Sequence, residues 1–126
     1  MEGIEIVRHW ARHEDERGYV FCLIHASPLK ETLIMTRKKG SIFGNHYHTG
    51  KDPTRNPEIQ YLLKGKLRLT AKDMKSGKTE SFIVEENAEI RIAHMIAHKF
   101  EALEDCIVLE FHNEISDYKD MIKVEL

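Results

Sequence analysis

Short apolar runs separated by turn residues extend along the whole chain. The runs recur at intervals of about 8–12 residues, which is the spacing of strands in an all-β sandwich or barrel. Turn signals rich in Gly, Pro, Asp and Asn lie between them. Strands are predicted over residues 4–8, 18–24, 31–37, 42–48, 58–63, 66–73, 78–84, 89–92, 98–102 and 106–112.

Three further segments have patterns of their own. Residues 74–77 read Met-Lys-Ser-Gly and predict a hairpin turn between two strands. Residues 49–57 hold two prolines together with glycine, aspartate and asparagine, which predicts an irregular loop. After the last strand, Ser116 is a suitable N-cap, so the sequence allows one short helix over residues 116–124. No other stretch has the apolar spacing of an amphipathic helix, so the fold is predicted to be all-β.

Composition and charge narrow the classes of function. The chain has 126 residues, which is the size of one domain. Its 19 Lys and Arg residues against 21 Asp and Glu residues give a net charge of -2, which argues against nucleic acid as the main partner. No apolar stretch approaches the roughly 18–20 residues of a membrane span, and the N-terminus lacks the pattern of a secretory signal. We therefore expect a single domain over residues 1–126, a cytoplasmic location, and neither a nucleic acid nor a membrane partner.

The cysteines and one basic run are predicted to have ordinary structural roles. Cys22 and Cys106 lie in apolar, strand-like runs, and their spacing fits neither a zinc site nor a redox pair. Both are therefore expected to be small buried side chains. Residues 37–39 read Arg-Lys-Lys before a glycine and are expected to form a solvated turn.

The placement of the histidines indicates a metal site. His46 and His48 are two positions apart, so on a strand both point to one face, with their Cα atoms about 6–7 Å apart. Such a pair alone is more often a hydrogen-bonded or surface feature. Glu58 begins an otherwise apolar strand, where a charge is unfavourable unless it is paired or bound to a metal. His98 also stands at the start of a strand-like run.

These residues provide three imidazoles and one carboxylate from three separate strand starts. Nitrogen and oxygen donors of this kind suit one divalent first-row transition metal, namely Fe, Mn, Co, Ni, Cu or Zn. Magnesium and calcium fit poorly because they prefer mostly oxygen ligands. Four protein ligands on an octahedral ion would leave two positions for substrate or water.

The region 40–65 resembles the first cupin motif, which is a glycine, five residues, His-x-His, a short gap, a glutamate, six residues and a glycine. The matching residues are Gly40, His46, His48, Glu58 and Gly65. The second cupin motif resembles residues 87–98 more loosely, because Ala93 and Met95 stand where the family usually has proline and glycine. The resemblance implies a single-domain jelly-roll β-barrel whose lumen holds one small ligand. Carried over position by position, it implies that the metal ligands are His46, His48, Glu58 and His98.

This chain departs from the family pattern at two points. The gap between His48 and Glu58 is longer than the usual three or four residues. If residues 49–57 bulge outward the site is preserved, whereas a shift in register would remove Glu58 from it. The altered second motif leaves His94 as a competitor of His98 for the fourth ligand position.

A finer resemblance points to the nucleotide-sugar, RmlC-like branch of the cupins, which serves polysaccharide biosynthesis. Residues 43–48 read Phe-Gly-Asn-His-Tyr-His and residues 15–18 read Asp-Glu-Arg-Gly, and both resemble sequences of that branch. The branch includes epimerases, 3,4-ketoisomerases and the cupin domain of capsular-polysaccharide reductases. Many of the ketoisomerases use the two histidines as acid and base without a metal and lack the glutamate. The presence of Glu58 therefore favours a metal in this chain.

Other residues are candidates for substrate contact or catalysis. Gln60 shares a strand face with Glu58 and either points at the ligand or joins a buried polar network. The remaining candidates are each also readable as ordinary surface or packing residues. They are Lys51 and Arg55, as binders of a phosphate or carboxylate, and His94 and His112, as catalytic bases.

Three functions remain open at this point. The first is an isomerase or epimerase of a keto-sugar nucleotide in which the metal acts as a Lewis acid. The second is an iron-dependent dioxygenase, and the third is a non-enzymatic small-molecule-binding module with a structural metal. The fold alone does not choose among them. Because cupins commonly pair through strand edges, we also expect a homodimer, with strand 4–8 as the candidate for exchange.

Overall fold

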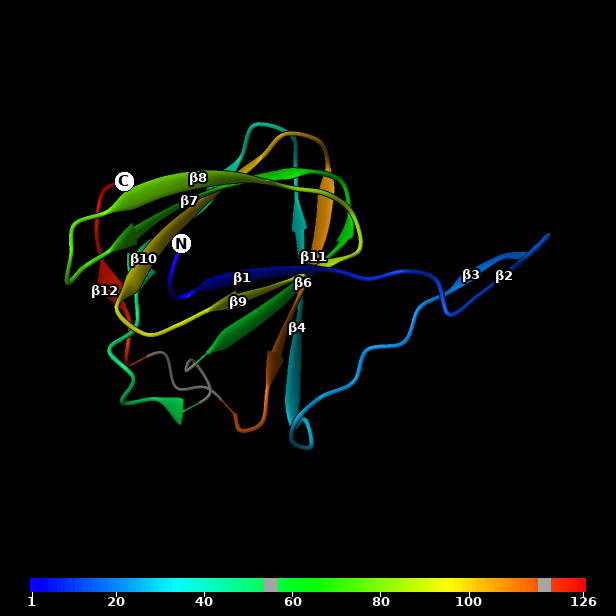
Figure 1. Cartoon of the computed structure of the whole chain (residues 1–126), viewed down its shortest axis with the longest axis horizontal. Helices are drawn as coiled ribbons and strands as arrows, with labels where there is room; N and C mark the ends of the chain where they lie inside the picture. The colour runs from blue at the N-terminus through cyan, green and yellow to red at the C-terminus, as the bar shows by residue number, and fades with distance from the viewer. Residues whose placement is uncertain (54–56, 116–118) are drawn as a thin grey trace.

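The structure, a computed structural model, describes residues 1–53, 57–115 and 119–126. Two five-stranded antiparallel sheets face each other, and a two-stranded hairpin extends away from them (Figure 1). The sheets have the strand orders β1-β9-β6-β11-β4 and β12-β5-β10-β7-β8. The strands are β1 (Ile4–Arg8), β2 (His13–Asp15), β3 (Gly18–Val20), β4 (Glu31–Arg37), β5 (Ile42–Tyr47), β6 (Glu58–Lys64), β7 (Leu67–Asp73), β8 (Thr79–Val84), β9 (Ala88–Ile92), β10 (Ile96–Ala102), β11 (Cys106–His112) and β12 (Ile122–Lys123).

The prediction of an all-β jelly roll is confirmed, and no α-helix occurs in the described ranges. Strands β1, β4 and β11 begin and end where the sequence pattern predicts. The predicted hairpin at residues 74–77 joins β7 to β8, with the amide of Asp73 donating to the carbonyl of Lys78. No helix in the described parts of the chain is long and apolar enough to cross a bilayer.

Two expectations of local structure are wrong in part, and two short strands were not predicted. The strand predicted over 18–24 stops at Val20, because the backbone after β3 has no strand beside it to pair with. The helix predicted over 116–124 does not form in its described part, where residues Ile122 and Lys123 pair with the edge of β5 instead. Residues 116–118 lie outside the described part of the chain. The short strands β2 and β12 were not predicted, because an alternating pattern cannot be recognised over two or three residues.

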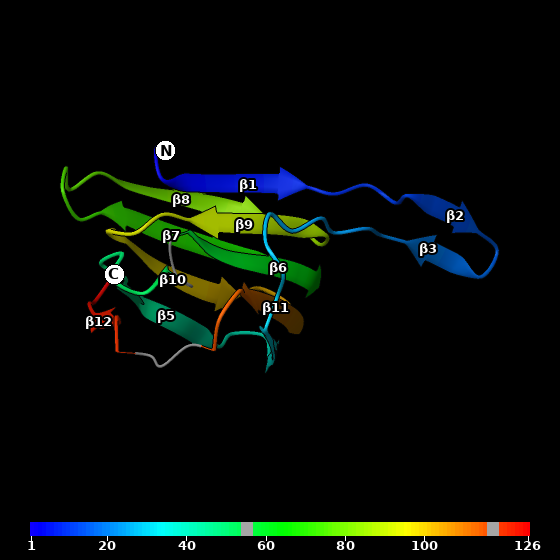
Figure 2. The same cartoon turned by 90° about the horizontal axis from the view of Figure 1, so that it is seen from below.

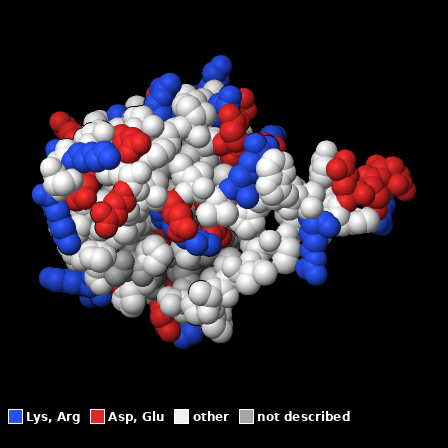
Figure 3. Space-filling model, in the orientation of Figure 1, with Lys and Arg blue, Asp and Glu red and all other residues white. Residues whose placement is uncertain are grey.

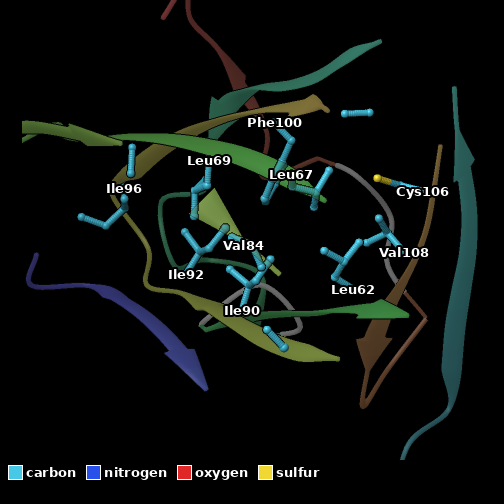
Figure 4. Packing of buried hydrophobic residues seen from close by; sticks show 13 residues of the cluster. Leu62, Leu67, Leu69, Val84, Ile90, Ile92, Ile96, Phe100, Cys106 and Val108 are labelled. Carbon is cyan, nitrogen blue, oxygen red and sulfur yellow. The ribbon is translucent and has the colours of Figure 1, made fainter. Parts of the chain in front are cut away.

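The hydrophobic core lies between the two sheets (Figure 4). Inward side chains follow the period of two expected for strands, as Leu67, Leu69 and Ala71 of β7 show. Ile90 and Ile92 of β9 face them from the first sheet. Full burial of each such Leu or Ile contributes about 1.5–3 kcal/mol to folding. The core therefore fixes which face of every strand points into the lumen.

The two cysteines have different surroundings. Cys106 is buried beside the core, as predicted, and burial raises the pKa of its thiol. Cys22 is exposed, so the prediction of a buried side chain is wrong at this position. The reason is that Cys22 lies after β3 on the projecting part of the chain and does not belong to a strand of the sandwich.

The arm, which we define as residues 10–24 with the β2–β3 hairpin, projects away from the sandwich (Figure 2). Its apolar side chains include Trp10, Tyr19 and Ile24, which are 74%, 64% and 85% exposed. Acidic side chains gather at its far end, whereas acidic and basic side chains are interspersed over the body in this view (Figure 3). A hairpin of three-residue strands is marginally stable without a surface to pack against.

A bulge in β5 turns its side chains at the point where the site begins. His46 pairs with His98 and Gly44 pairs with Lys99, so Asn45 is an extra residue on β5. Asn45 and Gly44 have φ angles of 58° and 91°. A Cβ atom on Gly44 would lie 2.8 Å from the carbonyl oxygen of His98, so only glycine fits there. The bulge allows both Phe43 and His46 to line the lumen cavity, although they are three positions apart.

Candidate functional site

The four residues that the sequence singles out as metal ligands lie together. One nitrogen or oxygen atom from each of them lies within 4.8 Å of those of the other three. Oε2 of Glu58 is 3.0 Å from Nε2 of His98 and 3.4 Å from Nε2 of His48. The residues come from β5 and its end, from the start of β6 and from β10: His46, His48, Glu58 and His98.

Main-chain carbonyl groups fix the ring orientation of two of these histidines. Nδ1 of His48 donates to the carbonyl of Asp120 at 2.5 Å, and Nδ1 of His98 donates to the carbonyl of Ile96 at 3.0 Å. With the proton on Nδ1, the neutral form of each ring directs the lone pair of Nε2 into the cluster, whereas the protonated form donates its Nε2 hydrogen to Glu58. Nε2 of His46 is buried and has no hydrogen-bond partner among the described residues. The cluster therefore presents nitrogen lone pairs and a carboxylate oxygen to one point.

The electrostatics of the cluster favour the forms that bind a metal. Burial lowers the pKa of His46 to about 4, and the neighbouring His98 adds to this effect. Burial alone would raise the pKa of Glu58, but the facing His98 imidazole and hydrogen bonds within the cluster hold it well below its usual range. At neutral pH the imidazole of His46 is therefore uncharged and the carboxyl group of Glu58 is ionised.

A buried polar chain continues from Glu58 across the first sheet. Nε2 of Gln60 donates to Glu58 at 3.3 Å and to Glu110 at 3.0 Å. His112 contacts Glu110 at 2.8 Å through Nε2 and Glu31 at 2.6 Å through Nδ1. The chain of contacts satisfies polar groups that would otherwise destabilise the core. It also connects the cluster to the partly exposed carboxylate of Glu31.

A cavity of about 230 Å³ opens beside the cluster, inside the lumen. Its polar lining includes Gln60, whose Oε1 atom is buried and has no hydrogen-bond partner among the described residues. The other lining residues are Leu33, Met35, Arg37, Phe43, Gly44, His46, Glu58, His98, Phe100, Glu110 and Met121. The cavity is therefore mostly apolar, with its acceptors and imidazoles concentrated at the cluster.

A larger cavity, of about 520 Å³, lies on the opposite face of the first sheet. Its charged groups neutralise one another, because Arg91 pairs with both Glu89 and Glu5. No group of three metal-ligating side chains borders it among the described residues. We therefore take the lumen cavity, which the cluster borders, as the candidate site.

The C-terminal segment completes the surroundings of the cluster. The buried carboxylate of Asp120 accepts hydrogen bonds from the amide and hydroxyl of Thr49 at 2.8 and 2.6 Å. It also accepts from the amides of Gly50 at 3.1 Å and Asp52 at 3.0 Å. These hydrogen bonds lower the pKa of Asp120 despite its burial. Met121, the next residue, lines the lumen cavity.

The structure brings some of the other predicted site residues to the cluster and not others. His98 belongs to the cluster, whereas His94 packs beside Gly50 and does not. His112 is buried behind Glu110 and does not line the cavity. Lys51 is exposed and borders a separate hollow of about 340 Å³. Arg55 lies outside the described residues.

Sequence reasoning missed several residues of this site. Glu110 was detectable, because it shares the inward face of β11 with Val108 and His112 at a spacing of two. Arg37 lines the cavity and is half-buried, so its assignment to a solvated turn is wrong, since it is the last residue of β4. Asp120 has no signal in the sequence, because its contacts are with residues about 70 positions away.

No protein-family profile matches the sequence, and no curated protein matches it. Solved structures do match. A dTDP-4-dehydrorhamnose 3,5-epimerase from Sulfolobus tokodaii is 27% identical, with a TM-score of 0.71 over 92% of this chain and 74% of that chain. The sugar 3,4-ketoisomerase QdtA from Thermoanaerobacterium thermosaccharolyticum, in complex with TDP, is 14% identical, with a TM-score of 0.77 over 97% and 88%.

A third structure is the epimerase RmlC from Legionella pneumophila, in complex with dTDP-4-keto-L-rhamnose. It is 15% identical, with a TM-score of 0.79 over 99% of this chain and 74% of that chain. These similarities confirm the resemblance to the RmlC-like branch of the cupins at the level of the fold. The solved structures that match this chain include epimerases and isomerases of sugar nucleotides.

Proposed function

We propose that this protein is an isomerase or epimerase of a keto-sugar nucleotide, with one divalent transition metal ion at the histidine cluster. The observation that carries the proposal is the cluster of His46, His48, Glu58 and His98 beside a lumen cavity. The same fold serves sugar-nucleotide epimerases and ketoisomerases in the structures that it resembles. We infer a small polar substrate from the unpartnered oxygen acceptor of Gln60 in that cavity.

The three imidazoles and the carboxylate of the cluster support the proposed metal ion. Nitrogen lone pairs and a carboxylate oxygen converge, and Nε2 of His46 has no hydrogen-bond partner within the described ranges. Buried polar atoms without partners are unfavourable, and a cation would satisfy them. Three imidazoles with one carboxylate suit Zn, Fe, Mn, Ni or Co. Bound there, such an ion would supply Lewis-acid polarisation of a substrate carbonyl.

The chain's own residues would perform the remaining tasks. Isomerisation of a keto sugar requires a base that removes a proton from the carbon next to the carbonyl group. Glu110 lines the cavity and is the carboxylate we assign to this task. His112 holds Glu110 in place from behind, so it would act through Glu110 rather than on the substrate. Oε1 of Gln60 would accept a hydrogen bond from a sugar hydroxyl.

Exchange of substrate hydrogen for deuterium tests the proposal directly. The protein, loaded in turn with each candidate metal, is incubated in D₂O with TDP-4-keto-6-deoxyglucose, the ligand bound in a structure of a QdtA variant. Proton NMR should show loss of the hydrogen next to the carbonyl and the appearance of an isomer. Glu110→Gln should slow the exchange at least about 100-fold. Absence of exchange with every metal, for this compound and for dTDP-4-keto-L-rhamnose, would reject the proposed activity.

The donor set also supports a second candidate, an iron-dependent dioxygenase. Histidine and carboxylate ligands with open positions are the ligand type of non-haem iron oxygenases. Oxygen consumption by the iron-loaded protein with diols, thiols and keto acids would favour this candidate. Tight metal binding without turnover in either assay would leave the non-enzymatic binding module.

We also propose that the protein is a homodimer. β1 lies at the edge of its sheet and pairs with β9 of its own chain, so the arm is a better candidate for exchange than β1. The exposed apolar side chains of the arm would gain a surface by packing on a second copy, which in turn would pack its own arm on the first.

A further inference from the structure

Arg37 is the cationic side chain of the lumen cavity, at the end of β4. Its guanidinium lies over the ring of Phe43, 4.8 Å from the ring centroid. Nη1 donates to the carbonyl of Thr36 at 3.1 Å, and Nη2 lies 3.6 Å from the sulfur of Met35. Nε is buried and has no hydrogen-bond partner in the described part of the chain. Stacking on Phe43 thus holds the guanidinium in place, while at least one strong donor is unused.

No ion pair joins Arg37 to an acidic residue within residues 1–53, 57–115 and 119–126. Arg17 and Arg68 are neutralised there by Asp15 and Glu101. Arg8 and Arg12 also have no ion pair among the described residues, but both are exposed and neither lines the lumen cavity. Arg91 pairs with two carboxylates on the opposite face of the first sheet. The positive charge of Arg37 is therefore available to a ligand of the lumen, where water is partly excluded and a charge-assisted hydrogen bond is strong.

The size of the cavity limits what else the ligand can contain. Its volume of about 230 Å³ lies below the roughly 300–1,000 Å³ of pockets that enclose whole drug-sized ligands. A group the size of one sugar ring matches this space better than a complete sugar nucleotide. The remainder of a larger ligand must therefore leave the lumen.

We propose that Arg37 binds an oxyanion, a phosphate or a carboxylate, carried by a ligand whose other part, about the size of a hexose, occupies the lumen. The fork of guanidinium donors matches the oxygen geometry of either anion. The identification of that oxyanion as the phosphate next to the sugar of a sugar nucleotide rests on the proposed function. The binding of an anion by Arg37 does not.

Calorimetric titration tests this assignment with three probes of similar size. Glucose 1-phosphate carries a phosphate, glucuronate carries a carboxylate, and methyl glucoside is uncharged. The variants are Arg37→Gln and Arg37→Lys, with Lys38→Gln as the matched control, because Lys38 is the next residue, is exposed and does not line the cavity. Unfolding midpoints in urea establish that each variant is folded.

We expect at least one of the two acids to bind the wild-type protein, and Arg37→Gln to weaken that binding about tenfold or more. Lys38→Gln should change the Kd less than about twofold, because an exposed charge is screened. Arg37→Lys should give an intermediate Kd, since it keeps the charge and loses the fork. The acid that binds more tightly identifies the phosphate or the carboxylate as the natural group.

Three results would overturn the assignment: neither acid binds the wild-type protein, Arg37→Gln binds both as tightly as wild type, or Lys38→Gln loses as much affinity as Arg37→Gln. Failure of the proposed function is a separate result. In that case binding that depends on Arg37 persists while no keto-sugar nucleotide exchanges its hydrogen for deuterium.

Discussion

The main-chain carbonyl oxygen of Asp120 lies 2.5 Å from Nδ1 of His48. The side chain of the same aspartate holds the amides of Thr49, Gly50 and Asp52, directly after this histidine. One residue of the C-terminal segment thus sets both the ring orientation of His48 and the path of the chain that follows it. Groups behind a metal-binding histidine commonly have this orienting role.

Asp120→Asn tests that relationship. An amide group in place of one carboxylate oxygen would face backbone N–H donors, so at least one hydrogen bond is lost and a donor is left unpaired. We expect the free energy of unfolding to fall by about 1–3 kcal/mol, measured by urea denaturation. Asp105→Asn is the control, because Asp105 accepts one exposed hydrogen bond from the amide of Lys39. Equal losses in the two variants would contradict a special role for Asp120.

Gly44→Ala should destabilise the protein through the bulge in β5. The new Cβ atom would lie 2.8 Å from the carbonyl oxygen of His98, and the backbone has a φ angle of 91°. Gly40→Ala is matched to it, with a φ angle of 88° and no atom within 4 Å of the added Cβ. Both variants carry the cost of a left-handed backbone, about 1–2 kcal/mol. Thermal unfolding should show a clearly larger loss of stability for Gly44→Ala than for Gly40→Ala. Similar losses in the two variants would show that the backbone near His98 moves and relieves the close approach.

Metal binding depends on Glu58 in the proposed site. We expect elemental analysis of protein purified without chelator or nickel resin to find about one transition metal ion per chain. Glu58→Ala should weaken metal affinity by at least about 10–100-fold, since even residues behind the ligands have effects of this size. Glu89→Gln is the control, because Glu89 is equally buried but pairs with Arg91 outside the lumen.

Unchanged metal content in Glu58→Ala would remove this residue from the ligand set. If the wild-type protein binds none of the candidate ions, even after incubation with each one, His46 and His48 would instead serve as acid–base groups, as in the metal-free ketoisomerases.

The stability of the metal-free protein should depend on His46 below neutral pH. The pKa of His46 falls from 6.5 to about 4 on folding, so between these values the unfolded chain binds the proton and the folded protein does not. The contribution of His46 to stability is therefore fully present above pH 6.5 and is lost as the pH falls toward 4, by at most about 3 kcal/mol, and by less where solvent screens the ring. Urea denaturation of chelator-treated protein between pH 7 and 4 measures this loss. His46→Gln should remove part of the slope, and an identical slope in the variant would contradict the lowered pKa.

Dimerisation through the arm predicts a change of mass in solution. Replacing Trp10 and Ile24 together with serine should shift the sedimentation equilibrium of the protein from dimer toward monomer. Ile83→Ser is the control, since Ile83 is 51% exposed on β8 of the other sheet. A wild-type protein that is monomeric at all concentrations, or a dimer unaffected by the double substitution, would exclude the arm as the contact.

The sequence alone determined the all-β class, most strand positions and three candidate members of the cluster, His46, His48 and Glu58, with His98 or His94 left open as the fourth. These follow from local rules, because side chains two apart share a strand face and a charged residue in an apolar strand needs a partner. The pattern around β5 and β6 also carried the resemblance to the cupin motif. Glu110 could have been predicted to face the lumen in the same way, because it lies two positions from both Val108 and His112 on β11.

Only the tertiary structure decided how the strands are ordered and what surrounds the cluster. The choice of His98 over His94 depends on the register of β10 against β5, including the bulge at Asn45, which no local pattern predicts. The contacts of Asp120 with residues near His48 join positions about 70 apart. Arg37 faces the lumen because β4 extends as far as this residue and because its guanidinium stacks on the ring of Phe43. Such contacts between distant segments arise when the sheets pack, so a pattern read along one segment cannot specify them.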